Sequence, residues 1–169
     1  MKKMKRLVAV LLAGIMALAM LTACGGTPVT RDEALEKSVA EWAVEWGKSA
    51  KLELTEDADL TAISAKCLPS MAKAYNATLA KDNDAAADAA AEMSKIFVAA
   101  KKDKKVAPVD VLIPNTMEFT KENVINVVQK GMGNIQAILN KAGVKNPAKF
   151  GVTVTKQKEY TLVLFVVSE

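Results

Sequence analysis

The sequence contains no histidine and only two cysteines among its 169 residues. Serine and cysteine hydrolases of the triad type use an imidazole as their general base, and catalytic zinc sites use imidazole ligands, so the sequence supports neither class. It also lacks a glycine-rich phosphate loop, because Gly131-Met132-Gly133 is followed neither by a further glycine nor by a Lys-Ser/Thr pair. We therefore expect no catalytic residue, no metal site and no cofactor.

The N-terminus carries the most specific motif of the chain. Basic residues at positions 2, 3, 5 and 6 precede an apolar run from Leu7 to about Leu21, a pattern that is typical of a secretory signal. The run is shorter than the roughly 20 residues that a membrane-spanning helix needs. It ends in Leu21-Thr22-Ala23-Cys24, which resembles the lipobox of bacterial lipoproteins. The resemblance implies that the Cys24 thiol is diacylated and that the chain is cut just before it.

This interpretation divides the chain into three parts. Residues 1–23 are a lipoprotein signal peptide, residues 24–29 form a flexible tether, and residues 30–169 form one globular domain. Stable anchoring takes more than one acyl chain, and two or three chains on Cys24 meet that need. We expect a protein of the bacterial cell envelope, held to a membrane at Cys24 and outside the cytoplasm. The alternative is an ordinary cysteine that is buried or disulfide-bonded.

The basic character of the chain comes from the segment before Cys24. The isoelectric point is about 9.0 and the net charge is +4. Four of the 23 basic residues and none of the 19 acidic residues precede Cys24, so the remainder carries 19 of each. The charge balance therefore does not indicate a nucleic-acid partner. The lysines at positions 101, 102, 104 and 105 are interpreted as a solvated helix end, with contact to an anionic lipid or polymer as the alternative.

Apolar spacing and capping signals predict most of the secondary structure. Helices are expected from Thr30, the start of a capping box with Glu33, to Gly47; from Leu60 to Leu79; from the cap Asn83 to Ala100; and from the cap Thr120 to Gly143. We expect Pro69 to kink the second helix or to divide it in two, and Gly131 and Gly133 to break the fourth. Strands are expected at residues 106–113, 150–154 and 160–167.

The final segment, from Tyr160 to Val167, is apolar at almost every position. A strand that is buried on one face alternates apolar and polar residues, whereas a strand covered on both faces does not. The last strand is therefore expected to be central, with helices on both faces of its sheet. This predicts an α+β fold, namely a three-layer α/β/α sandwich with a small, mainly antiparallel sheet of about three strands and four or five helices.

The order of these elements resembles the CAP or SCP-like domain of the cysteine-rich secretory protein, antigen 5 and pathogenesis-related superfamily. The matching residues are Asn134-Ile135, Ile138-Leu139, Gly151-Val152-x-Val154 and the segment from Leu54 to Ala72. Glu122-Asn123-Val124-Ile125 is similar to a Glu-Asn-Ile element of that family, although here it falls in a helical stretch. Members with a metal-binding cleft use a pair of histidines, which this chain lacks. The resemblance thus implies a CAP-like domain without that metal site, which binds a lipid, a peptide or an envelope component.

The leading functional interpretation is a membrane-anchored lipoprotein that acts as a non-catalytic binding module for a lipid, a peptide or an envelope protein. One alternative is a carboxylate-dependent hydrolase of an envelope polymer that uses Asp57 and Asp59, although acidic residues at a helix start usually complement the dipole. Another is a structural or assembly lipoprotein with no small ligand. Trp42 and Trp46 share an apolar helix stripe, where core packing is favoured over a ligand platform. Cys67 is expected to be a small buried hydrophobe, because it has no disulfide partner once Cys24 is modified.

Overall fold

The structure, a computed structural model, describes residues 29–102 and 104–169. In these residues there are five helices and four strands. The helices are α2 (Glu33–Ser49), α3 (Ala58–Leu79), α4 (Asn83–Lys101), α5 (Lys121–Lys130) and α6 (Met132–Ala142). The strands are β1 (Thr55–Glu56), β2 (Val106–Pro114), β3 (Lys149–Lys156) and β4 (Tyr160–Ser168). The lipobox-like sequence and Cys24 lie outside the described residues.

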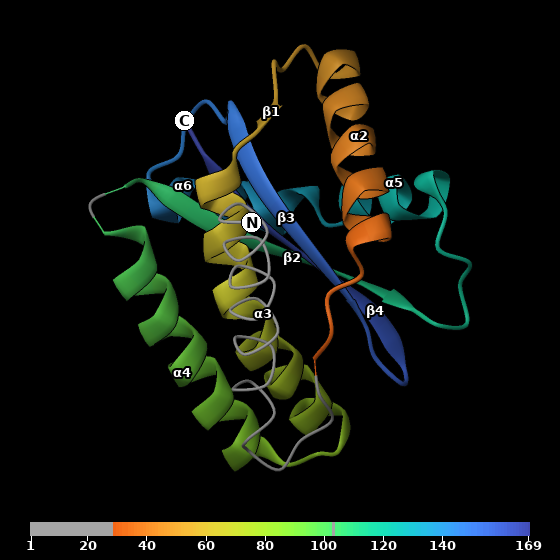
Figure 1. The fold of residues 1–169 in the computed structure, drawn as a ribbon, viewed down its shortest axis with the longest axis vertical. Helices are drawn as coiled ribbons and strands as arrows, with labels where there is room; N and C mark the ends of the chain where they lie inside the picture. Colours follow the sequence, from red (N-terminus) through yellow and green to blue (C-terminus); the bar gives the residue numbers. More distant parts are fainter. Residues whose placement is uncertain (1–28, 103) are drawn as a thin grey trace, which may run out of the picture.

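The four strands form one mixed sheet in the order β1-β3-β4-β2 (Figure 1). Strand β4 pairs antiparallel with β3 and with β2 over nearly its whole length, and the two-residue β1 pairs with β3 in parallel. The last strand is therefore central, as its unbroken apolar run predicts. The short strand β1 is the addition to the three strands that the sequence indicates.

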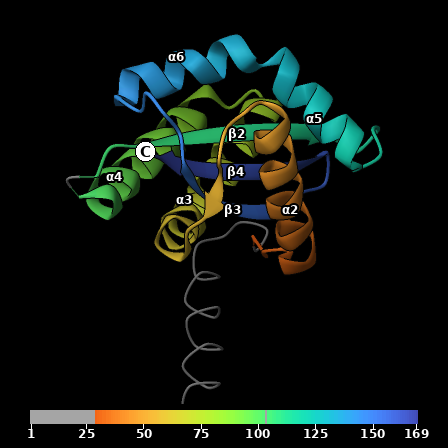
Figure 2. The same ribbon diagram turned by 90° about the horizontal axis from the view of Figure 1, so that it is seen from above.

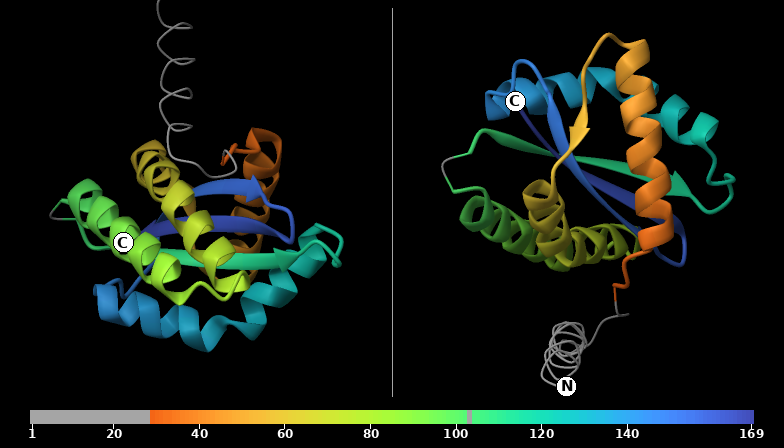
Figure 3. Two further views of the ribbon diagram at one scale, coloured as in Figure 1. Left: turned by 90° about the horizontal axis from the view of Figure 1, so that it is seen from below. Right: turned by 45° about the horizontal axis from the view of Figure 1, so that its top comes forward.

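Helices cover both faces of the sheet, which confirms the α+β class and the three-layer arrangement. Helices α2, α5 and α6 pack on one face, and Figure 2 shows α5 and α6 as an arc over β2. Helix α3 packs on the other face against β3 and β4, with α4 beside it (Figure 3). Along β4, Leu162 and Leu164 join the core under α3, whereas Val163 joins the core under α2. Each face of the central strand thus supports its own hydrophobic core.

Two helices begin at a different capping residue from the one that the sequence suggests. Asp32, and not Thr30, is the N-cap of α2, because its carboxylate accepts the backbone N–H of Leu35. In the same way Asp82 caps α4, so that Asn83 is the first helical residue. The predicted helices exist, and their N-caps are shifted by one or two residues.

Helix α3 continues through Pro69, so the expectation of two short helices is wrong. An interior proline costs about 3 kcal/mol or more through its lost N–H and its ring clash. The helix offsets this cost by burying residues such as Leu60 and Leu68 against the sheet and by packing along α4. Its close approach to β3 depends on Gly151, where a Cβ atom would lie 1.9 Å from the Thr61 nitrogen.

Candidate functional site: an apolar groove

The candidate site is a groove on the face of the sheet that α2, α5 and α6 cover. Its volume is about 170 Å³, and it lies between α2 on one side and α5 and α6 on the other. The α2 wall consists of Val39, Trp42, Ala43 and Trp46, which recur at the three- and four-residue spacing of one helix face. Both tryptophans are half-buried. Both line the groove, and Trp42 also packs against the hydrophobic core under α2, the place that the sequence favours for it.

The opposite wall is an equivalent stripe of α6, made of Met132, Ile135, Gln136 and Leu139. Helix α6 begins where α5 ends, at Gly131, which confirms the break that the two glycines predict. Because the helix is divided there, α5 and α6 follow the arc seen in Figure 2 instead of one straight line. Val124, Ile125 and Val128 of α5 extend the same apolar wall.

The floor of the groove is the face of β2 and β4, together with Phe150 of β3. Phe165 and Val167, which lie on the central strand, are only half-buried. Leu164 and Val166, on the opposite face of the same strand, have no exposed surface. On this face of the sheet α2 packs chiefly on β3, and α6 packs on β2, so neither helix is centred over the last part of β4. The groove lies over this part of the central strand, between the two helices.

The chain between α2 and β1 closes one end of the groove with Leu52 and Leu54. Helix α2 ends in a Schellman-type turn, in which the Leu52 N–H donates to the Gly47 carbonyl at 2.8 Å and Lys51 has a left-handed φ of 59°. A Cβ atom on Gly47 would lie 3.0 Å from the Leu52 oxygen and from the Leu54 side chain. Glycine at position 47 therefore lets both leucines lie against the α2 stripe without a small shift of the turn.

The lining of the groove is almost wholly apolar. Among the lining residues, Gln136 carries the one amide side chain, the two indoles carry the other polar atoms, and none is charged. Trp42 also contacts Phe119, with ring centroids 6.0 Å apart and an interplanar angle of 35°. Such a lining can bind an apolar ligand, but it holds no group that would transfer a proton or attack a substrate.

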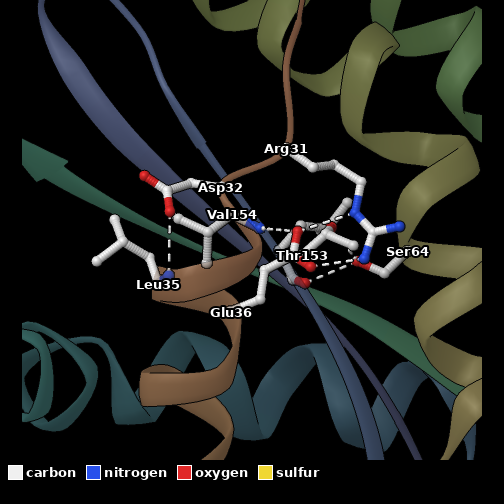
Figure 4. Close-up of polar contacts among 8 residues, drawn as sticks. Arg31, Asp32, Leu35, Glu36, Ser64, Thr153 and Val154 are labelled. Atoms are coloured by element: carbon white, nitrogen blue, oxygen red, sulfur yellow. Dashed lines mark hydrogen bonds and ion pairs between the residues drawn. The ribbon is translucent and has the colours of Figure 1, made fainter. Parts of the chain in front are cut away.

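A separate polar cluster fixes the start of α2 to the sheet (Figure 4). Glu36 is 7% exposed; its carboxylate accepts hydrogen bonds from the Arg31 guanidinium at 2.9 and 2.5 Å and from the Val154 N–H at 3.0 Å. The Asp32 N–H donates to the Val154 carbonyl at 2.8 Å. The hydrogen bond with Glu36 raises the pKa of Arg31 above its ordinary value. We call these four residues the Arg31–Glu36 clamp. Its hydrogen bonds satisfy the backbone N–H and C=O groups of Val154 on the edge of β3, beyond the residues that pair with β1.

Asp57 and Asp59, the acidic residues that the hydrolase alternative would use, lie at the start of α3. The Asp57 carboxylate is the N-cap and accepts the backbone N–H groups of Asp59 and Leu60. The Asp59 carboxylate forms a salt bridge of 3.2 Å with Lys104, a member of the lysine cluster. Both carboxylates therefore have partners that are typical of a helix start.

Cys67 is fully buried in the core under α3, as its apolar surroundings predict. Burial raises the pKa of its thiol to about 11. A thiol that is buried and protonated at neutral pH is a poor nucleophile, since the thiolate is the reactive form.

Within residues 29–102 and 104–169, no group of three or more cysteine, aspartate and glutamate side chains is placed to hold a metal ion. In the same residues, no helix combines the length and the apolar character that a membrane crossing requires. Comparisons with protein families, with curated proteins and with solved structures found no match. The likeness of residues 21–24 to a lipobox and of the domain to the CAP superfamily therefore stays a prediction.

Proposed function

We propose that the chain is a membrane-anchored lipoprotein of the cell envelope whose globular domain is a non-catalytic module that binds an apolar ligand in the groove. The observation that supports the proposal is the groove itself, a space of about 170 Å³ that apolar side chains from three helices and the sheet line. Large apolar side chains that a fold leaves half-exposed in a concave site are typical of ligand binding. Under this proposal the domain is a CAP-like domain without the histidine-based metal site.

The groove lies along the middle and the C-terminal part of α2. The chain enters the domain at the Arg31–Glu36 clamp, next to the first turn of α2. Val39, the first lining residue of α2, follows Glu33 by six residues and Trp46 follows it by 13, which corresponds to rises of about 9 Å and about 20 Å. The binding site is therefore set apart from the point at which the tether joins the fold.

The anchor is tested by the variant Cys24→Ala, with Cys67→Ala as the matched control. We expect the chain to leave the membrane fraction, or to remain uncut, only when Cys24 is replaced, because the acyl chains are attached to its thiol. Fractionation and intact-mass measurement give the result. The anchor would be refuted if Cys24→Ala stayed in the membrane fraction and its intact mass showed the same cleavage and acylation as the unsubstituted chain.

Binding in the groove is tested with N-phenyl-1-naphthylamine, an apolar fluorescent probe. Both tryptophans of the sequence line the groove, so energy transfer from tryptophan to the probe reports its occupation. We expect Ile135→Glu, which places a carboxylate in the α6 wall, to weaken probe binding at least tenfold. Val98→Glu is the control, because Val98 is an apolar residue of α4 that is 58% exposed and lies outside the groove. Equal binding by the two variants would mean that the groove is not the site.

A further inference from the structure

We propose that the outer face of α4 is the surface through which two copies of this chain associate, with their α4 helices antiparallel. The face is uncovered in the described part of the chain, and its two halves carry charges of opposite sign. A second copy that approaches in the reverse direction supplies the complementary charges. The inference goes beyond the proposed function, because α4 lies on the side of the sheet opposite the groove.

Helix α4 is the outermost element on its side of the molecule. It packs along α3 and forms no comparable contact with any other element of residues 29–102 and 104–169. Figure 1 and Figure 3 show α3 on the inner side of α4 and no described element on its outer side. Of its 19 residues, Ala89 and Phe97 are buried. The side that points away from α3 therefore lies open among the described residues.

The open side of α4 carries short and apolar side chains along its middle. Ala87, Ala91 and Val98 follow one another at intervals of four and seven residues, which places them on one helix face. All three are exposed, and Val98 is exposed by 58%. The solvent face of a helix ordinarily carries charged and polar residues. Alanine at such positions lets a second helix approach to the short end of the roughly 8–10 Å range of interaxial distances.

Charged residues border these apolar positions on one flank, and their sign changes along the helix. Asp84 and Asp88 lie in the N-terminal half of α4 and Lys95 lies in the C-terminal half. At about 100° for each residue, the three side chains project on the same flank. All three are exposed, and none forms a salt bridge within the described residues. The flank is thus acidic at one end and basic at the other.

The helix dipole accounts for only part of this pattern. It favours acidic residues in the first turn and basic residues in the last, and its effect falls off beyond those turns. Asp84 lies in the first turn, but Asp88 and Lys95 lie outside the terminal turns. Asp84 and Asp88 are also four residues apart, and two like charges at this spacing destabilise an isolated helix. A cationic partner on this flank offsets that cost.

An antiparallel second copy of α4 is complementary on both flanks. A two-fold axis that passes between the helices near Ala91 places each position opposite one that lies equally far beyond the axis. Asp88 then faces Lys95 of the second copy, and Ala87 faces Val98 on the other flank. A parallel pair would instead bring the two acidic halves together and leave Asp88 without a cationic partner. The antiparallel contact uses the same patch on both copies, so it closes as a dimer.

The contact is limited to one helix pair. Helix α4 has 19 residues and is about 28 Å long. A contact along one helix of this length belongs to the small interfaces, below about 1,200 Å², that are typical of transient association. We therefore expect a weak dimer whose population rises with protein concentration.

Sedimentation velocity of the full chain over a range of concentrations tests the dimer. Asp88→Lys and Lys95→Glu should each weaken it by roughly threefold or more, because each turns two attractive contacts of the dimer into repulsive ones. The double variant Asp88→Lys, Lys95→Glu should restore it, since the exchanged charges are again complementary. Glu41→Lys is the matched control, because Glu41 is an exposed acidic residue of α2. Circular dichroism establishes that each variant is folded.

Cross-linking determines how the two helices are oriented. A short bismaleimide should join Ala91→Cys chains to one another. In a mixture of two variants it should join Ala87→Cys to Val98→Cys and link neither variant to itself, because the antiparallel arrangement separates like positions away from the axis. The unsubstituted chain, which contains Cys24 and Cys67, gives the background.

Three results would overturn the inference. The first is a chain that stays monomeric at every concentration up to about 1 mM. The second is a dimer that Asp88→Lys weakens no more than Glu41→Lys does. The third is a link of Ala87→Cys to itself without one to Val98→Cys, which would show a parallel pair. Binding of the naphthylamine probe is measured on the same variants, so that a loss of the dimer and a failure of the groove are told apart.

Discussion

Replacing Gly151 with alanine should destabilise the fold strongly, because this glycine lets α3 touch the backbone of β3. An added Cβ would lie 1.9 Å from the Thr61 nitrogen and 2.1 Å from the Leu60 carbonyl carbon. Non-bonded contacts of this kind are ordinarily above 3 Å, and the opposing atoms belong to a helix backbone that cannot rotate away. Helix α3 must therefore retreat from the sheet by about 1 Å, and a gap of that size forfeits a quarter to a half of each dispersion contact.

The cost follows from what α3 buries. The residues that seat it on the sheet include Leu60, Cys67 and Leu68, which are at most 2% exposed. Overpacking of a core costs about 1–3 kcal/mol when side chains can adjust. Here the backbone itself must move, so we expect at least 3 kcal/mol, a large share of the roughly 5–15 kcal/mol that stabilises a typical domain.

Urea unfolding of the full chain, followed by circular dichroism, measures this loss as a lower midpoint with an unchanged slope. Gly133→Ala is the matched control, since a Cβ atom at that position in α6 meets nothing within 4 Å. The control should gain up to about 1 kcal/mol, because alanine is the better helix former. A loss below 1 kcal/mol in Gly151→Ala would show that the close approach of α3 to β3 is wrong.

Further predictions concern the caps, the clamp and the buried thiol. Lys81 has a left-handed φ of 61°, so Lys81→Gly should raise the free energy of unfolding by about 0.5–1 kcal/mol in urea. Glu36→Gln should lower it by about 1.5–3 kcal/mol, because the charge-assisted bonds with Arg31 are lost; an unchanged urea midpoint would contradict the clamp. Cys67 should react with iodoacetamide at pH 8 only after unfolding, as peptide mass mapping can show; rapid labelling of the native chain would contradict its burial. The cap hydrogen bond with the Leu60 N–H lowers the pKa of Asp57 below its ordinary 3.8, so its stabilisation is present above that pH and is lost as the pH falls through the lowered value. Asp57→Ala should therefore cost about 1 kcal/mol at pH 7 and less at pH 3, and an equal cost at both pH values would refute the role of the charge.

Features of the fold that depend on local sequence were predictable. The run from Tyr160 to Val167 has no polar alternation, so burial on both faces follows from the sequence alone. Gly131 and the cap Thr120 likewise act through the backbone of their own turns, and both delimit α5 as expected. Asp32 and Thr30 are both good capping residues, and local preference does not distinguish them. The contact of the Asp32 N–H with the Val154 carbonyl, which joins distant parts of the chain, favours Asp32.

The groove could not be predicted, because it depends on how far apart two helices sit on one sheet. Trp42 and Trp46 have the same spacing whether another helix covers them or leaves them open. Helix α2 packs along β3 and α6 packs along β2, and this placement depends on the assembled sheet. The half-exposure of Phe165 on a central strand is a consequence of this spacing, and no residue near Phe165 in the sequence signals it.

The Arg31–Glu36 clamp also determines how the domain bears a mechanical load. A pull on the chain ahead of residue 29 reaches the fold at Arg31 and Asp32, which are bonded to Glu36 and Val154. The Asp32 and Glu36 bonds carry the pull to Val154 of β3, which pairs with β4 along its eight residues. Two hydrogen bonds with Val154 must break before such a pull can unwind the first turn of α2.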